Sequence, residues 1–166
     1  NSKLPPAKLN SAAAATIGIA FKNVQLFLDT RELSVRDGLT GCFNRGYGLD
    51  ALDAELRRSR RSGAPVSVLM FDVDHFKSVN DRFGHLVGDE LVHAVGAHLE
   101  RMLRRTDVRC RYGGDEFLIL LPDTPALGAH QVAEGLRQGL GTVRLAVQGP
   151  APAITLSIGV ATAIET

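Results

Sequence analysis

The spacing of apolar residues divides the chain into helical and extended segments. Apolar positions three or four residues apart predict helices, and short continuous apolar runs predict buried strands. Helices are expected over 11–36, 47–61, 76–83, 88–105 and 126–140, and strands over 66–71, 108–112, 117–121, 143–147 and 154–161. This order favours an α+β fold of the ferredoxin-like or palm type, in which helices flank a mostly antiparallel central sheet.

The first predicted helix carries a heptad-like apolar stripe. Ile17, Phe21, Val24, Leu28 and Val35 follow steps of four, three, four and seven residues, and Arg31 occupies the skipped position. Such a stripe packs either against the helix's own domain or against a second copy. Its place ahead of the globular part favours pairing with a second copy. We therefore predict a tail and a linker or dimerisation helix over 1–36, followed by one globular domain over 37–166.

Composition narrows the function classes. The 166 residues suffice for about one domain, and 19 Lys+Arg against 18 Asp+Glu give a net charge of +1. This balance argues against a protein that binds nucleic acid through a strong basic field. No apolar run approaches the roughly 20 residues of a membrane span, so this segment is not expected to bind a membrane. Cys42 and Cys110 show neither metal nor redox spacing, and two such thiols fit the reducing cytoplasm.

Acidic residues gather at two points where strands are expected to end or turn. Asp72 and Asp74 directly follow an apolar strand, and Asp115 and Glu116 directly follow a Gly-Gly pair. If the two strands are neighbours, Asp72 and Asp115 converge at one end of the sheet. Two or three hard oxygen ligands there suit Mg²⁺, which takes its other ligands from water and substrate phosphates. Any one of these acids alone is more simply a strand-end cap, but the two clusters together favour metal-assisted phosphoryl or nucleotidyl transfer.

The polar segment between the acid clusters offers groups that suit a nucleotide. Lys77 lies in the first helical turn after the strand, where its charge can neutralise phosphate. Asn80 and Asp89 supply the donor and acceptor pair that reads a guanine edge. Taken singly, Asn80 is better explained as a helix-surface residue, and Asp89 as an acid near a helix N-terminus. His85 and His93 have no second ligand at metal spacing, which argues against a zinc site.

Five ordered motifs resemble those of one family. The run Arg111-Tyr112-Gly113-Gly114-Asp115-Glu116-Phe117 contains the signature of the GGDEF family, the bacterial diguanylate cyclases. The other segments that agree with the family pattern are 37–41 with Asn44-Arg45, 71–77 with Asn80-Asp81, 83–85 with Gly88-Asp89, and 157–161. The resemblance covers residues 37–163.

The resemblance implies that two GTP molecules, one on each domain of a homodimer, condense to cyclic di-GMP with release of pyrophosphate. It implies Mg²⁺, or Mn²⁺, held by Asp72, the Val73 carbonyl and Asp115. Asp115 is expected to act as the base for the 3′-hydroxyl with Glu116 beside it, and Lys77 to stabilise the transition state. The residues expected to bind GTP are Phe76, Asn80, His85, Asp89, Gly113 and Gly114, with Asn80 and Asp89 on the guanine.

The family also has an inhibitory product site with the pattern R-x-x-D ahead of the Gly-Gly pair. Arg104 and Asp107 fit this register, because five residues separate Asp107 from Gly113. Arg can bind guanine through two hydrogen bonds, and Asp can accept from its Watson–Crick edge. The plainer alternative is an arginine favoured by the dipole at a helix C-terminus. Two rival functions stay open: a GGDEF module that only binds cyclic di-GMP or GTP as a sensor and, with less support, an interaction scaffold.

The resemblance also sets expectations for the two ends of the chain. The sequence stops at Thr166, just after the last matching strand. We therefore expect the domain to lack the family's last helix and the basic residues that contact GTP phosphates. Residues 12–27 resemble the last helix of a GAF sensor domain, so a GAF-like sensor is expected upstream in the full protein.

Overall fold

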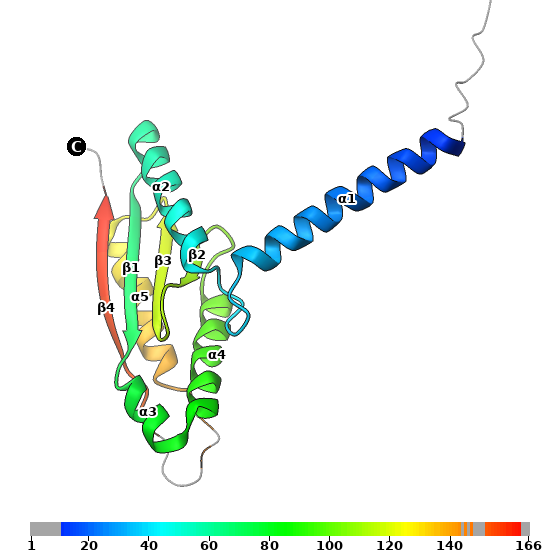
Figure 1. Cartoon of the computed structure of the whole chain (residues 1–166). Coiled ribbons are helices and arrows are strands. Elements are labelled where there is room, and N and C mark those ends of the chain that lie inside the picture. Colours follow the sequence, from blue (N-terminus) through cyan, green and yellow to red (C-terminus); the bar gives the residue numbers. More distant parts are fainter. Residues whose placement is uncertain (1–10, 144, 146, 148–151, 164–166) are drawn as a thin grey trace, which may run out of the picture. The chain divides into compact units, whose positions relative to one another are not determined.

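The structure, a computed structural model, describes residues 11–143, 145, 147 and 152–163 (Figure 1). Within the first helix it describes the side chains of residues 14–25 and 35. The chain forms two compact units, of which the first ends at Ser34 and the second begins at Val35. Within these described ranges, no helix is long and apolar enough to cross a bilayer.

The first unit holds nearly all of α1 (Ser11–Val35), a single continuous helix. Three residues of the predicted stripe, Ile17, Phe21 and Val24, have 48%, 74% and 57% of their surface exposed. The side chain of Leu28 lies outside the described residues. Val35, the last residue of the stripe, is half-buried. The pairing of this helix with a second copy stays a prediction.

The second unit is built on a four-stranded sheet in the order β2-β3-β1-β4. The strands are β1 (Val66–Val73), β2 (Val108–Arg111), β3 (Glu116–Pro122) and β4 (Leu156–Ala163). All neighbouring strands in this sheet are antiparallel, which confirms the predicted α+β fold. The apolar run at the centre of β3 is buried along its whole length, because helices cover both faces of the sheet.

One face of the sheet is covered by a single helix and the other by two. α2 (Arg45–Ser62) packs over β2 and β3, where Cys110, Leu118 and Leu120 form a small core. α4 (His85–Met102) and α5 (Ala126–Leu140) bury the larger core on the opposite face, around residues such as Leu69 and Phe117. Figure 1 shows α2 and α5 on opposite sides of the sheet, with α3 (Phe76–Phe83) beyond the end of β1.

Two glycines end helices by leaving the right-handed backbone region. Gly63 has a φ of 70°, and its N–H donates to the Ser59 carbonyl oxygen at 2.8 Å, which closes α2 with a left-handed cap. Gly84 has a φ of 87° and joins α3 directly to α4. As a result α4 begins at His85 rather than at residue 88. It ends at Met102 rather than at residue 105, because the backbone of Leu103 is extended.

The strand predicted over 143–147 is wrong in its described part. Val143, Leu145 and Val147 belong to no strand, and residues 144 and 146 lie outside the described residues. The Val147 N–H donates to the Leu145 carbonyl oxygen at 3.0 Å. A bond between residues two apart forms a tight turn and not a sheet ladder. The last predicted strand is present, at Leu156–Ala163 rather than at 154–161.

Candidate active site

Two carboxylates face each other across neighbouring strands. Asp72 of β1 is the register partner of Glu116 of β3, and Ser157 of β4 is its partner on the other side. Register partners in an antiparallel pair place their side chains on the same face, about 5 Å apart at Cβ. Asp72, Glu116 and Ser157 line a small pocket of 120 Å³. Like charges in direct opposition destabilise a sheet, so this pair suits a bound cation.

The Gly-Gly turn makes room for one of these carboxylates. The N–H groups of Tyr112 and Gly113 both donate to the Glu116 carbonyl oxygen, at 2.8 and 3.2 Å. A Cβ atom on Gly113 would lie 2.5 Å from Oε2 of Glu116, so the carboxylate occupies the space that any other residue would fill. Asp115 lies in the same turn with its surface partly exposed. A side chain at position 113 would therefore displace the Glu116 carboxylate from this position.

The side chain of Arg111 holds this turn in place through hydrogen bonds that were not predicted from the sequence. Its guanidinium donates to the carbonyl oxygens of Gly113 and Gly114, at 3.1 and 2.8 Å. Its Nη1 also donates to both oxygens of Asp37, at 3.2 and 3.1 Å. Asp37 and Arg111 each belong to a motif that matches the family, and this was the signal in the sequence that could have pointed to them. Arg111 thereby ties the turn with Asp115 to the loop that begins the domain.

The Asp37 carboxylate is itself held in place. It accepts the Thr40 N–H at 2.9 Å and the Thr40 hydroxyl at 2.7 Å. Burial alone would raise the pKa of Asp37, but the two Thr40 hydrogen bonds and the charge of Arg111 together lower it below the usual value. The Thr40 turn lies against Gly96 of α4, where a Cβ atom would be 2.5 Å from the Thr40 carbonyl oxygen. The Asp37–Arg111 pair is therefore connected, through Thr40, to α4, which packs on the larger core.

The corner between α3 and α4 holds the half-buried side chain of Asn80. Oδ1 of Asn80 is buried and has no hydrogen-bond partner within the described residues. A Cβ atom on Gly88 would clash with this oxygen and lie 3.3 Å from the Phe76 ring, so the Asn80 amide sits close to both residues. An unpaired buried polar atom costs about 1–3 kcal/mol. A ligand that donates a hydrogen bond to Asn80 would remove this cost.

Two further predicted GTP ligands, His85 and Asp89, and the predicted catalytic Lys77 belong to α3 and α4 near this corner, whereas Gly113 and Gly114 lie in the turn before β3. Asp89 follows Gly88 on α4 and is exposed, and His85 is the exposed first residue of the same helix. Lys77 is exposed in the first turn of α3. α3 begins at Phe76, directly after β1 and a turn in which His75 has a φ of 60°. This sharp turn brings the α3–α4 corner to the same end of β1 as Asp72 and Val73.

Asp74, by contrast, is used in holding the sheet together. Its Oδ1 accepts the Ser157 hydroxyl at 2.6 Å, and its N–H donates to the Thr155 carbonyl oxygen at 3.0 Å. The hydrogen bond from Ser157, with a further one from Thr155, lowers the pKa of Asp74. Asp74 therefore fastens β4 to the end of β1.

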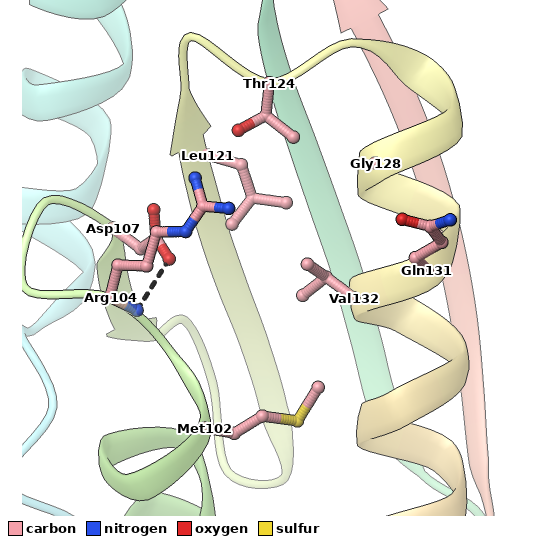
Figure 2. A pocket seen from close by; sticks show the side chains of 8 residues that line it. All are labelled: Met102, Arg104, Asp107, Leu121, Thr124, Gly128, Gln131 and Val132. Carbon is pink, nitrogen blue, oxygen red and sulfur yellow. Dashed lines mark hydrogen bonds between the residues drawn. The ribbon is translucent and has the colours of Figure 1, made fainter.

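Arg104 and Asp107 form a turn at the far end of β3 from Glu116. Oδ2 of Asp107 accepts the Arg104 N–H at 2.8 Å, and only 8% of Asp107 is exposed, so burial raises the pKa of its carboxyl. Figure 2 shows the Arg104 side chain reaching toward Leu121 and Thr124 beside a pocket of 240 Å³, which α5 closes with Gln131 and Val132. Within the described residues, no hydrogen bond or ion pair engages the Arg104 guanidinium, while one oxygen of Asp107 accepts the Arg104 N–H.

The donor set fits a hard divalent cation better than zinc. No group of three or more His, Cys, Asp or Glu side chains that could hold a metal occurs in the part of the chain that the structure describes. Mg²⁺ needs only one or two carboxylates, because water and substrate phosphates complete its octahedron. Asp72 and Glu116, with the Val73 backbone carbonyl next in the strand, satisfy that requirement.

Comparison with known proteins identifies the family. The family model described as "Diguanylate cyclase, GGDEF domain" matches residues 34–166. The response regulator PleD of Caulobacter vibrioides is 44% identical over 106 residues, which are 64% of this chain and 23% of PleD. The probable diguanylate cyclase DgcC of Escherichia coli is 41% identical over 129 residues, which are 78% of this chain and 34% of DgcC. The chain therefore spans about a quarter to a third of these relatives.

A solved structure agrees with the sequence matches. The coiled coil and GGDEF domain of DgcB from Caulobacter crescentus, in complex with c-di-GMP, superposes with a TM-score of 0.82 at 27% identity. The match covers 94% of this chain and 84% of that one. Sequence and fold thus lead to one conclusion: the chain belongs to the GGDEF domain family of diguanylate cyclases.

Proposed function

We propose that this chain is the catalytic part of a diguanylate cyclase, which condenses two GTP molecules to cyclic di-GMP and two pyrophosphates. The observation that carries the proposal is the opposition of Asp72 and Glu116 beside the Gly-Gly turn, in a chain of this family. Two like charges on adjacent strands are a structural cost unless a cation and its phosphate ligands occupy the site.

GGDEF diguanylate cyclases depend in general on a divalent metal, and we assign Mg²⁺, with Mn²⁺ as the alternative. Asp72, the Val73 carbonyl and Asp115 are the proposed ligands, and we propose Glu116, the register partner of Asp72, as a further one. When bound, the cation neutralises phosphate charge and helps to ionise the attacking hydroxyl. Gly113 and Gly114 let the nucleotide approach the backbone of the turn closely.

The other side chains of the site have separate proposed roles in catalysis and in binding GTP. Asp115 accepts the proton of the 3′-hydroxyl, whose oxygen forms a bond to the α-phosphorus of the second GTP while the bond to pyrophosphate breaks. Lys77 adds positive charge where the phosphates gather. Asn80, whose Oδ1 is buried near Phe76, and Asp89 bind the guanine, and His85 lies near the ribose or base. A second transfer in the opposite direction closes the ring.

Two domains must meet, since each holds one GTP. We propose that the exposed stripe of α1 pairs with that of a second copy and that residues 1–36 act as the linker to the domain over 37–166. Product feedback at Arg104 and Asp107, a GAF-like sensor upstream and a cytoplasmic location stay predictions from the sequence.

The test is to incubate the full-length protein with GTP and Mg²⁺ and to measure cyclic di-GMP by chromatography and pyrophosphate release. We expect both products in a ratio of about one to two, as the stoichiometry of the condensation requires. GTP binding without product would instead support the rival function, a sensor module that binds GTP or cyclic di-GMP. An Asp115→Asn variant controls for contaminating cyclase and is expected to lose turnover.

A further inference from the structure

Three oxygen-bearing side chains lie in a row across the sheet near the end of β1. Asp72 has Glu116 of β3 as its register partner on one side and Ser157 of β4 on the other, and Figure 1 shows the three strands side by side. Register partners in antiparallel strands place their side chains on one face, about 5 Å apart at Cβ. All three residues line the same pocket of 120 Å³. The two carboxylates belong to the proposed cation site, whereas the Ser157 hydroxyl has no role in the reaction described above.

The hydrogen of the Ser157 hydroxyl is already engaged. It is donated to Oδ1 of Asp74 at 2.6 Å. The Asp74 N–H donates to the Thr155 carbonyl oxygen at 3.0 Å, so Asp74 is itself tied to the backbone just ahead of β4. A hydroxyl has one hydrogen and two lone pairs. Because its hydrogen is given to Asp74, the Ser157 oxygen can only accept hydrogen bonds from its other neighbours.

The Ser157–Asp74 bond matters more for orientation than for stability. Ser157 is exposed and Asp74 is half-buried, so water can replace either partner when the bond is lost. Among the residues that the structure describes, no side chain forms a hydrogen bond or ion pair with the Asp72 or Glu116 carboxylate. The row therefore consists of acceptors alone. A cation, and the water molecules that it holds, supply the positive charge and the donors that this row lacks.

We propose that Ser157 is a positioning residue for the cation: its oxygen accepts a hydrogen bond from a cation-bound water molecule, and Asp74 orients the hydroxyl for this contact. The inference rests on the proposed function, which places a divalent cation at Asp72 and Glu116. Mg²⁺ keeps several waters when only one or two carboxylates hold it. Groups that hydrogen-bond to the ligands of a metal fix their orientation and strengthen its binding. Ser157 supplies such a group from the third strand.

The same strand carries a second hydroxyl that serves as a control. Oγ1 of Thr162 lies 2.7 Å from Oγ of Ser67, its register partner on β1, and the two share a hydrogen bond. Ser67 lies near the start of β1, whereas Asp72 lies near its end. Thr162 thus takes part in the same kind of bond between the same two strands, but away from the carboxylates. A purely structural role of Ser157 would make the two hydroxyls equivalent.

The test measures the affinity of the full-length protein for Mn²⁺ by electron paramagnetic resonance, in the presence of 3′-deoxy-GTP, which lacks the attacking hydroxyl. Mn²⁺ takes the place of Mg²⁺ because its unpaired electrons report binding directly. The variants are Ser157→Val, Ser157→Thr and, as the matched control, Thr162→Val. Valine and threonine are both β-branched and suit strands, so the first two variants differ in the hydroxyl. We expect Ser157→Val to bind Mn²⁺ about tenfold more weakly than the wild type, and the other two variants to bind it as the wild type does.

A second pair of variants tests the orienting role of Asp74. Asp74→Asn and Asp74→Ala remove the same charge, but only asparagine keeps an oxygen that can accept the Ser157 hydroxyl. We expect Asp74→Ala to weaken Mn²⁺ binding more than Asp74→Asn does. In a Ser157→Val background the two substitutions are expected to have equal effects, because no hydroxyl is left to orient.

Wild-type affinity for Mn²⁺ in Ser157→Val would overturn the proposal, as would an equal loss in Thr162→Val, which would trace the effect to the sheet. The melting temperature of each variant confirms that it is folded during the titration, and Ser157→Ala replaces Ser157→Val if the valine variant does not fold. A wild type that binds no Mn²⁺ with 3′-deoxy-GTP would also overturn the proposal. Conversion of GTP is measured separately: a protein that binds Mn²⁺ through Ser157 but forms no cyclic di-GMP would refute the proposed function alone.

Discussion

Replacing Arg111 with alanine is expected to loosen the turn that carries Asp115 and Glu116. The guanidinium joins three acceptor groups, the carbonyls of Gly113 and Gly114 and the carboxylate of Asp37. In the Arg111→Ala variant, Asp37 keeps its hydrogen bonds from Thr40 but loses its counter-charge. Among the residues that the structure describes, no other side-chain donor then holds the carbonyls of Gly113 and Gly114.

The magnitude follows from the burial of the pair. A hydrogen bond to a charged group contributes about 1.5–3 kcal/mol to the free energy of unfolding. The Arg111 and Asp37 side chains are 19% and 23% exposed, so water replaces only part of what is lost. We expect a loss of about 3 kcal/mol over the three acceptors, which lowers the melting temperature by about 6–12 °C in a chain of this size. A displacement of the turn by about 1 Å is expected to lower turnover about a hundredfold.

Thermal unfolding and the rate of cyclic di-GMP formation test this prediction on the wild type, Arg111→Ala and Arg101→Ala. The last variant removes an exposed arginine from the end of α4 and controls for loss of charge. The rates are compared at a temperature where all three proteins are folded. A melting temperature of Arg111→Ala within about 2 °C of the wild type would refute the bracing role. So would an Asp37→Ala/Arg111→Ala double variant whose loss equals the sum of the single losses.

Three further outcomes are expected. Asn80→Ala removes the amide that is proposed to bind guanine, so competition assays should show a smaller preference for GTP over ATP; an unchanged preference would contradict the assignment. Burial of His98 against Gly139, together with the charge of Arg101, lowers the pKa of His98 in the folded state. The unfolded state therefore binds a proton at a higher pH than the folded state does, and the free energy of unfolding falls as the pH drops below 6.5. Urea unfolding of His98→Leu should show a smaller fall in stability toward about pH 5, and an equal fall would place the titration elsewhere. Arg104→Ala should shift the inhibition curve of added cyclic di-GMP to higher concentration when each rate is divided by that protein's own uninhibited rate, whereas superimposable curves would locate inhibition at the active site.

The sequence predicted those elements whose periodicity and end signals agree. α3 (Phe76–Phe83) and α5 (Ala126–Leu140) have the predicted bounds, because Gly84 ends the first and Pro125 directly precedes the second. The start of α4 was missed because a single glycine at φ 87° ends one helix and begins the next without a loop. The apolar residues Val143, Leu145 and Val147 alternate with other residues as in a strand. The hydrogen bond that forms a turn between Leu145 and Val147 is not predicted by this alternation.

Only part of the site could be predicted from the sequence. The approach of the two acid clusters followed from the assumption that their strands are neighbours, and β1 and β3 do pair at Asp72 and Glu116. Predicting that these two residues lie directly opposite each other requires the register of the two strands, which periodicity alone does not determine. The Arg111–Asp37 contact joins residues 74 positions apart, so it depends on the tertiary fold. The unpaired oxygen of Asn80 likewise became visible only once Gly88 was packed against it.

The most direct test of the account is the rate of cyclic di-GMP formation from GTP at saturating Mg²⁺ in the full-length wild type, Asp72→Asn and Asp50→Asn. Asp50 is an exposed acid on α2, so its variant changes the net charge equally without touching the site. The account predicts product from the wild type and from Asp50→Asn, and a loss of at least about a hundredfold in Asp72→Asn at a melting temperature no lower than that of the wild type. Turnover by Asp72→Asn close to that of the wild type would contradict it, as would a wild type that binds GTP and forms no cyclic di-GMP.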